Sequence, residues 1–187
     1  MIYKLIYKFF ILILIIGLIF PCILIAIIIK LTSEGPIIHW SKRVGINNTL
    51  FLMPKFRTMT LGTPDVATHL LENQNQYIYK FGSLLRKTSI DEIPQLYSIL
   101  LGHMNIVGPR PALYNQDNLI NLRTKNGIHT LKPGITGWAQ VNGRDNISIE
   151  EKVGLELVYL KNKSFKFDIY IIFLTVISVT SKKNINH

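Results

Sequence analysis

The chain has 187 residues, which is room for one domain of ordinary size, and its one cysteine, Cys22, excludes an intramolecular disulfide and a cysteine-based zinc site. Hydrophobic residues make up 48% of the chain and the mean hydropathy is +0.27, so we expect an association with membrane lipid. The formal net charge of +10 suits an anionic partner, but it does not choose among nucleic acid, anionic lipid and a phosphorylated substrate.

An uncharged run from Phe9 to Ile29 dominates the N-terminal part of the chain, with Lys8 before it and Lys30 after it. A helix of about 20 apolar residues spans a bilayer, so the simplest interpretation is a single-pass anchor. Pro21 should break or kink this helix within the lipid, and a kink permits re-entry on the same face. From the residues alone, a kinked span and a re-entrant hairpin both stay open.

The water-facing part of the chain begins with a predicted β-hairpin. Its strands are expected at Ile37–Trp40 and Thr49–Phe56, joined through residues 45–48. Alternation along the second strand places Lys55 and Arg57 on one side. Two cations on one face could meet a phosphate, but they could equally keep an exposed strand edge soluble.

Two adjacent carboxylates, Asp91 and Glu92, interrupt a stretch of helical periodicity that ends at Leu101. Because Pro94 is tolerated only in the first turn of a helix, the second helix should start near the acidic pair, where free backbone N–H groups would attract a phosphate. Ser89 precedes Glu92 at the spacing of a capping box, which would give Glu92 a purely structural role.

Two later segments present cations on a constrained backbone. Pro109 and Pro111 flank Arg110 and restrict where its guanidinium points, so a binding role and a stiff connector explain this segment equally well. The stretch from Lys132 to Arg144 contains three glycines and a tryptophan and looks like a shaped binding loop, although a tight turn with a buried tryptophan is the alternative. It has neither the Walker A nor the dinucleotide-binding spacing.

The remaining segments predict structure without chemistry. The five histidines are scattered without metal-ligand spacing and receive no role. We expect a loop with a short helix at 61–76, helices at 113–123 and 149–160, the second of them opened by a capping box of Ser148 and Glu151, and an apolar segment at 167–179 that lies along the membrane surface or completes the core.

Four motifs, in their order along the chain, resemble those of the bacterial sugar transferases, the monotopic phosphoglycosyl transferases of polysaccharide and glycoprotein assembly. The motifs are Lys55–Met59, Thr88–Glu92, Val107–Pro111 and Pro133–Arg144. Any one of them is weak evidence, whereas four in order behind a proline-interrupted apolar segment are specific. The resemblance covers nearly all of the chain.

This resemblance implies a fold and a location. The fold is mainly α with a small β-hairpin, in which residues 1–31 form a membrane-embedded helix, re-entrant and kinked at Pro21. Residues 32–181 form a cytosolic catalytic domain with interfacial helices, and residues 182–187 form a polar tail. The location is the bacterial inner (cytoplasmic) membrane, with the catalytic domain on the cytoplasmic face.

The resemblance also implies a reaction. Sugar 1-phosphate passes from a UDP-sugar, expected to carry an N-acetylated amino or deoxyamino sugar, to polyprenyl phosphate, and UMP is released. This is the first membrane step of capsule, O-antigen or glycoprotein glycan assembly. Asp91 matches the nucleophile, which forms an aspartyl phosphosugar in ping-pong kinetics and contacts Mg²⁺, and Glu92 matches the second member of the dyad.

Cationic positions complete the site that the resemblance implies. Arg86 and Arg110 match phosphate-binding positions, and Lys55, Arg57 and Arg144 are weaker candidates. The implied partners are UDP-sugar, polyprenyl phosphate and membrane lipid, with a homodimer left open. We expect no nucleic acid, because cations interleaved with stacking aromatics are missing. A membrane phosphohydrolase and a basic protein that binds anionic lipid are the alternative functions.

The chain departs from the family pattern in two places. Many members have a serine before the proline of the membrane segment, where this chain has Phe20, so a hydroxyl that could satisfy freed backbone groups is missing. Gly154 and Glu156 stand where many relatives carry glutamate and aspartate, so the resemblance assigns these two residues no functional role.

Overall fold

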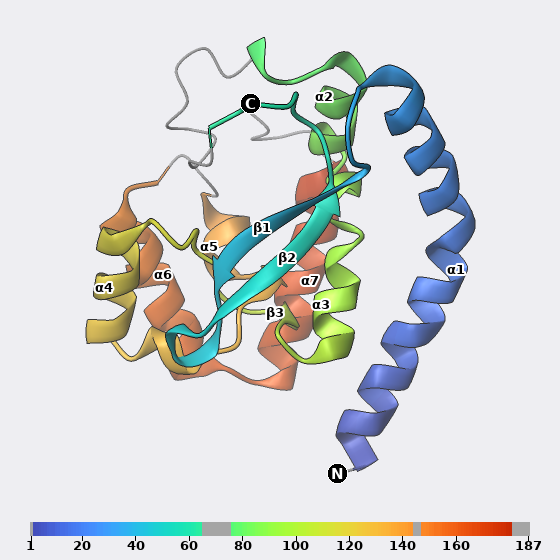
Figure 1. Cartoon of the computed structure of the whole chain (residues 1–187). Helices are drawn as coiled ribbons and strands as arrows, with labels where there is room; N and C mark the ends of the chain where they lie inside the picture. Colours follow the sequence, from blue (N-terminus) through green and yellow to red (C-terminus); the bar gives the residue numbers. More distant parts are fainter. Residues whose placement is uncertain (1, 65–75, 144–146, 181–187) are drawn as a thin grey trace. The chain divides into compact units, whose positions relative to one another are not determined.

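The computed structural model describes residues 2–64, 76–143 and 147–180, so most of the loop predicted at 61–76 lies outside the described residues. The chain is mostly helical (60%), with a small antiparallel hairpin and one long apolar N-terminal helix, which confirms the predicted mainly α fold with a β-hairpin (Figure 1). Re-entry of the helix and a cytoplasmic catalytic domain remain predictions. It folds into two compact units: the first contains residues 1–41 and 53–102, and the second contains residues 42–52 and 103–187.

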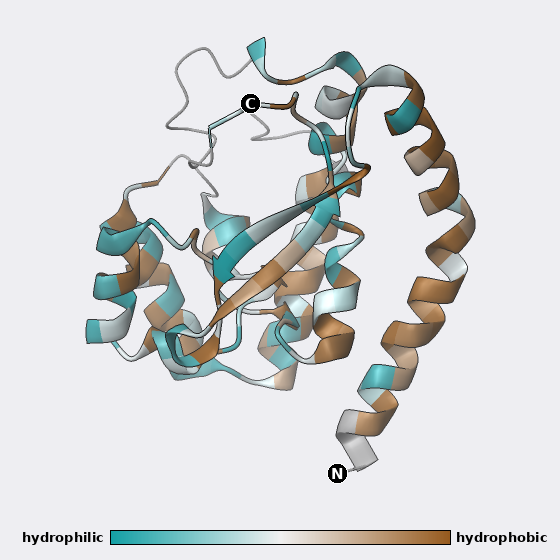
Figure 2. Cartoon of the chain, viewed as in Figure 1, coloured by the Kyte–Doolittle hydropathy of each residue, from teal (hydrophilic) through white to brown (hydrophobic). Residues whose placement is uncertain are grey.

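Helix α1 (Ile2–Thr32) contains the whole apolar run as one helix of 31 residues. Such a helix is about 46 Å long, more than the roughly 30 Å of a bilayer's hydrocarbon core. By length and composition it qualifies as a membrane span, and only 6% of its apolar window is buried in the protein. The helix continues through Pro21, and Figure 1 shows that its axis bends along its length. In Figure 2 it is the most continuously hydrophobic element.

The predicted hairpin is present, with a longer first strand than expected. Strand β1 (Ile38–Val44) pairs with β2 (Leu50–Phe56) through the short 3₁₀ turn η1 (Ile46–Asn48). In the turn, Asn47 and Asn48 have φ angles of 51° and 58°, a left-handed conformation that asparagine tolerates well. Asparagines at the tip thus let the chain reverse without a glycine there.

The core of the first unit joins α1 to the water-facing part of the chain. Ile29 of α1, Phe56 of β2 and Leu85 of helix α2 (Lys80–Lys87) are buried together. Gly82 allows α2 to lie close to the backbone of Thr58, because a β-carbon at residue 82 would lie 2.2 Å from the Thr58 carbonyl oxygen. Helix α3 (Gln95–Leu101) follows α2 and packs against α1.

The second unit is built around a parallel strand pair that the sequence analysis did not predict. Strand β3 (Asn105–Val107) pairs with β4 (Gly134–Thr136). Its described residues also form the α-helices α4 (Asp117–Lys125), α5 (Trp138–Asn142), α6 (Ile149–Asn162) and α7 (Phe165–Thr180). Three of them, α4, α6 and α7, lie at predicted segments. Helix α6 begins with the predicted capping box: the Ser148 side chain accepts the Glu151 N–H at 3.1 Å, and the Glu151 side chain accepts the Ser148 N–H at 2.9 Å.

Tyr159 lies at the centre of the second unit's core. Its hydroxyl donates to Oδ1 of Asp168 at 2.8 Å, which ties α6 to the start of α7. Burial raises the pKa of Tyr159 well above its ordinary value, and the Asp168 carboxylate adds to this effect. The phenol therefore stays a neutral donor throughout the physiological range.

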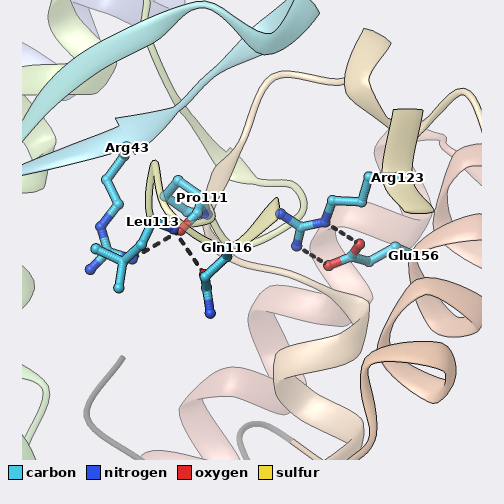
Figure 3. Close-up of polar contacts among 6 residues, drawn as sticks. All are labelled: Arg43, Pro111, Leu113, Gln116, Arg123 and Glu156. Carbon is cyan, nitrogen blue, oxygen red and sulfur yellow. Dashed lines mark hydrogen bonds and ion pairs between the residues drawn. The ribbon is translucent and has the colours of Figure 1, made fainter. Parts of the chain in front are cut away.

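A buried ion pair connects α4 to α6 (Figure 3). The guanidinium Nε of Arg123 donates to Oε2 of Glu156 at 2.7 Å, and its Nη2 also contacts Oε1. The two side chains are 9% and 2% exposed, so each charge depends on the other. This pair accounts for Glu156, a position for which the resemblance supplied no role.

We expect Glu156→Gln to lower the free energy of unfolding by about 3 kcal/mol, because it leaves the Arg123 charge buried without a counter-charge. Denaturant unfolding of the purified protein in detergent would measure this loss. Glu150→Gln is the matched control, since Glu150 is an exposed acidic residue in the first turn of the same helix. Equal effects of the two substitutions would contradict a special role for the pair.

Candidate active site

The acidic pair lies in a tight turn between α2 and α3. Helix α2 ends at Lys87 with Thr88 as its C-cap, and the next residue, Ser89, has φ 55° and ψ 17°, a left-handed conformation that is uncommon for serine. The hydroxyl of Thr88 donates to the Leu84 carbonyl at 2.9 Å and helps to close the helix end. The chain then makes one 3₁₀ turn, η4 (Ile90–Glu92), which carries both carboxylates.

The structure corrects two predictions about this turn. The helix expected to start near Asp91 starts later, at Gln95, with Pro94 as its N-cap. The capping box between Ser89 and Glu92 is absent, because the Ser89 side chain makes no capping hydrogen bond. The capping role considered for Glu92 is therefore excluded, and a strained non-glycine residue next to a carboxylate pair is typical of functional sites.

Asp91 and Glu92 differ in their exposure to water. Asp91 is only 7% exposed, whereas Glu92 is partly exposed. The residues on either side of the pair, Ile90 and Ile93, pack against the apolar cluster that contains Ile29 of α1. The acidic turn is thus fixed to the end of α1, with one carboxylate turned inward and the other within reach of solvent.

Gln95 and Ser98 share the buried side of this segment, and sequence reasoning missed both. Each is 1% exposed, and neither Nε2 of Gln95 nor Oγ of Ser98 has a hydrogen-bond partner within the part of the chain that the structure describes. They follow Asp91 by four and seven residues, a helical spacing that places polar groups on one face. That spacing, together with the apolar residues around it, was the signal that could have identified them.

Three of the predicted cations belong to the same unit as the acidic pair. Arg86 lies in the last turn of α2 and Lys55 in β2, and both are partly exposed. Arg57 differs, because it is 5% exposed and its guanidinium donates to the carbonyls of Ser33, at 2.9 Å, and Glu34. Its charge thus stabilises the chain that leaves α1.

Alternation of Lys55 and Arg57 on an exposed strand face is not what the structure shows. The strand ends at Phe56, and both Phe56 and Arg57 are buried. The Arg57 carbonyl accepts a hydrogen bond from the hydroxyl of Tyr79. Burial raises the pKa of Tyr79, although the positive charge of Arg57 opposes this shift. Phosphate binding by Arg57 remains a prediction, and the described contacts give this residue a structural role.

Arg110 belongs to the second unit, in a segment whose main chain is held from both sides. The Gly108 N–H donates to the Thr136 carbonyl and the Gly134 N–H to the Pro109 carbonyl, both at 2.9 Å. Nη1 of Arg43 donates to the Pro111 carbonyl at 3.1 Å (Figure 3). The rigid presentation of Arg110 inferred from its flanking prolines therefore has hydrogen bonds to support it.

The predicted binding loop at 132–144 forms β4 and the short helix α5. Gly137 lies against the Gly108 carbonyl, where a β-carbon would come within 2.1 Å. The Trp138 ring packs on those of Phe167 and Tyr170, with centroids 5.0 and 6.2 Å apart. Among the described residues, both polar atoms of the Gln140 amide are buried without a hydrogen-bond partner. Arg144 lies outside the described residues.

The described residues contain no group of three or more histidine, cysteine, aspartate or glutamate side chains that could hold a metal ion. Magnesium does not require such a group, since one or two carboxylates and the substrate's phosphates are its usual ligands. The paired oxygen donors of Asp91 and Glu92 fit that chemistry. A Mg²⁺ site at this turn therefore remains a prediction.

We expect Ser89→Val to be less stable than Ser89→Gly by about 1 to 2 kcal/mol, because a β-branched side chain is strained at positive φ and glycine is not. Thermal unfolding of the two variants would measure the difference. At Ser83, inside α2, the same pair of substitutions should give the reverse order, since glycine weakens a helix interior. The same order of stability at Ser89 and at Ser83 would contradict the left-handed conformation of Ser89.

Comparison with known proteins places this site in a context. Residues 1–182 match the family described as "Bacterial sugar transferase". The chain is 40% identical over 158 residues to the "Uncharacterized sugar transferase EpsL" of Bacillus subtilis (strain 168), covering 84% of this chain and 77% of that protein.

Two further relatives carry names that state a reaction. The "UDP-glucose:undecaprenyl-phosphate glucose-1-phosphate transferase" of Escherichia coli (strain K12) is 40% identical over 160 residues, which are 81% of this chain and 34% of that protein. The "UDP-N-acetylgalactosamine-undecaprenyl-phosphate N-acetylgalactosaminephosphotransferase" of Aeromonas hydrophila is 32% identical over 156 residues, 81% of this chain and 37% of that protein. The chain spans about a third of the length of these two relatives.

Proposed function

The chain belongs to the bacterial sugar transferase family, as its four motifs predicted, and we propose that it transfers a sugar 1-phosphate from a UDP-sugar to polyprenyl phosphate. The names of the Escherichia coli and Aeromonas relatives support this general reaction. The observation that carries the proposal is the acidic turn, because it holds a buried carboxylate on a strained loop next to an apolar helix.

Asp91 is the nucleophile of the proposed reaction. Its carboxylate oxygen forms a bond to the β-phosphorus of the UDP-sugar, and the bond from that phosphorus to the bridging oxygen breaks as UMP leaves. An oxygen of polyprenyl phosphate then attacks the same phosphorus and releases Asp91. The burial of Asp91 supports this role, since it limits the access of water to the intermediate.

Glu92 and the cations assist this chemistry. Glu92, the more exposed carboxylate, orients Asp91 or takes the proton of the lipid phosphate. Mg²⁺, held by Asp91, would neutralise the diphosphate charge. Arg86 and Arg110 bind phosphate oxygens, and Lys55, Arg57 and Arg144 are the weaker candidates for the same task.

The sugar and the pathway are the finer part of the proposal. We favour an N-acetylated amino or deoxyamino sugar, and the first membrane step of capsule, O-antigen or glycoprotein glycan assembly. The relatives are named for glucose, N-acetylgalactosamine and galactosyl transfer, so sugar choice varies among proteins similar to this chain. A panel of UDP-sugars tested for lipid-dependent UMP release would identify the donor.

The membrane location rests on two apolar surfaces. Helix α1 exposes large hydrophobic side chains along its length, and we propose that it re-enters the cytoplasmic face of the inner membrane at Pro21. On α7, Phe165, Ile169 and Phe173 are 69%, 50% and 60% exposed and recur every four residues. Such a stripe suits a helix that lies in the membrane interface.

We predict that Asp91→Asn abolishes transfer, because it removes the nucleophilic charge without changing the side-chain volume. The assay combines purified protein, UDP-sugar, Mg²⁺ and polyprenyl phosphate, and measures both UMP and the lipid-linked product. Wild-type protein incubated with UDP-sugar and Mg²⁺, without polyprenyl phosphate, should also gain the mass of one sugar phosphate on the peptide that contains Asp91, whereas the variant should not.

Asp117→Asn is the control for this experiment, since Asp117 is an exposed carboxylate at the start of α4 and should keep full activity. Transfer activity in the Asp91→Asn variant would contradict the proposed mechanism. Release of UMP by the wild-type protein without any lipid product would identify a phosphohydrolase instead, and binding of anionic vesicles without UMP release would indicate a lipid-binding protein.

Re-entry of α1 predicts that both ends of the helix lie on one side of the membrane. Because Cys22 is the only cysteine, Cys22→Ser gives a cysteine-free background. Cysteines then introduced at Lys4 and at Lys87, which is exposed at the end of α2, should react with a membrane-impermeant maleimide from the same side. Labelling from opposite sides would show a true span.

A further inference from the structure

The segment from Gly108 to Pro111 cannot hold itself in place by its own backbone donors. Proline has no N–H, so only Gly108 and Arg110 in this segment can donate a main-chain hydrogen bond. Its carbonyls must therefore be held by donors from elsewhere. Gly134 supplies one of these donors, to the Pro109 carbonyl, and a side chain supplies the donor for Pro111.

That side chain is Arg43, on strand β1. Its Nη1 donates to the Pro111 carbonyl at 3.1 Å, while its backbone forms an antiparallel bridge with Leu113. The next residue, Val44, donates its N–H to the Ala112 carbonyl at 2.9 Å. The chain that leaves Arg110 is thus clamped by both the backbone and the guanidinium of one strand (Figure 3).

The environment of this contact makes it strong. Pro111, Ala112 and Leu113 are all buried, and Arg43 is only partly exposed. A charged donor forms a stronger hydrogen bond than a neutral one, and partial burial reduces its competition with water. Beyond the clamp, the Leu113 N–H donates to Oε1 of Gln116 at 2.9 Å, which closes the turn into α4.

We propose that Arg43 is a positioning residue, which fixes the backbone on the C-terminal side of Arg110 and thereby sets the affinity for the UDP-sugar. This inference rests on the proposed function, in which Arg110 binds a phosphate of the donor. Arg43 acts through the Pro111 carbonyl and needs no contact with the substrate. Small displacements of a binding group weaken substrate positioning steeply.

The test compares Arg43→Met with Lys42→Met. Lys42 is the adjacent residue, is exposed and holds its Nζ 5.3 Å from the Tyr114 ring centroid, so both variants lose one positive charge from neighbouring positions. We expect Arg43→Met to raise the KM for UDP-sugar about 10-fold, with little change in the KM for polyprenyl phosphate, and Lys42→Met to change neither. Equal effects of the two variants on KM would show that only the loss of a positive charge matters, and this result would overturn the proposal.

A double-mutant cycle with Arg110→Met identifies the route of the effect. If Arg43 acts through Arg110, adding Arg43→Met to Arg110→Met causes no further rise in KM. Additive effects would overturn the proposal, and so would wild-type KM in Arg110→Met alone. That last result would leave the Asp91 chemistry intact, so the two proposals fail separately.

Hydrogen exchange tests the geometric step without any enzyme activity. Arg43→Met should raise the exchange rate of the amides at Arg110, Ala112 and Leu113, whereas Lys42→Met should not, and Arg43→Lys should fall between them. Unchanged protection of these amides in a folded Arg43→Met protein would overturn the proposal, whatever the variant's turnover.

Discussion

The site depends on one constraint, which is that the acidic turn is pinned to the membrane helix. Ile90 and Ile93 bracket the two carboxylates and pack with Ile29 of α1, so the pair cannot move outward without exposing apolar surface to water. Ser89 accepts a left-handed backbone to make this placement possible. In the proposed function the apolar helix therefore has two roles: it associates with lipid, and it forms the wall against which the proposed nucleophile is held.

This arrangement bears on the choice between transfer and hydrolysis. The covalent phosphosugar that we propose on Asp91 would be productive only if the lipid phosphate reached it before water did. Asp91 is 7% exposed, which limits its access to water, and it lies next to an apolar helix that is long enough to span a membrane. Both features favour the lipid acceptor over water. An exposed carboxylate on a soluble domain would have the same chemistry with the opposite preference.

Two identical spacings show how far the sequence could predict the structure. Ser148 and Glu151 form the capping box that their spacing indicates, because Ser148 has an extended backbone at a free helix start. Ser89 and Glu92 do not, because Ser89, directly after the C-cap of α2, has a left-handed backbone and its side chain makes no capping hydrogen bond. The parallel pair β3–β4 escaped prediction for another reason, since strands of three residues are too short to show a period. Helices and the hairpin are encoded locally, whereas these features depend on what the neighbouring elements do.

The same distinction applies to the basic residues. The net charge of +10 suggests abundant capacity for phosphate, yet several arginines already have an internal acceptor. Arg57 holds two carbonyls beyond α1, Arg123 is paired with Glu156, and Arg43 holds Pro111. In these contacts the guanidiniums hold the chain, because a charge removed from water needs acceptors within the protein. Fewer cationic side chains are therefore left to bind a diphosphate than the net charge implies. How well those side chains are positioned depends on how rigidly the other arginines hold the backbone segments that contain them.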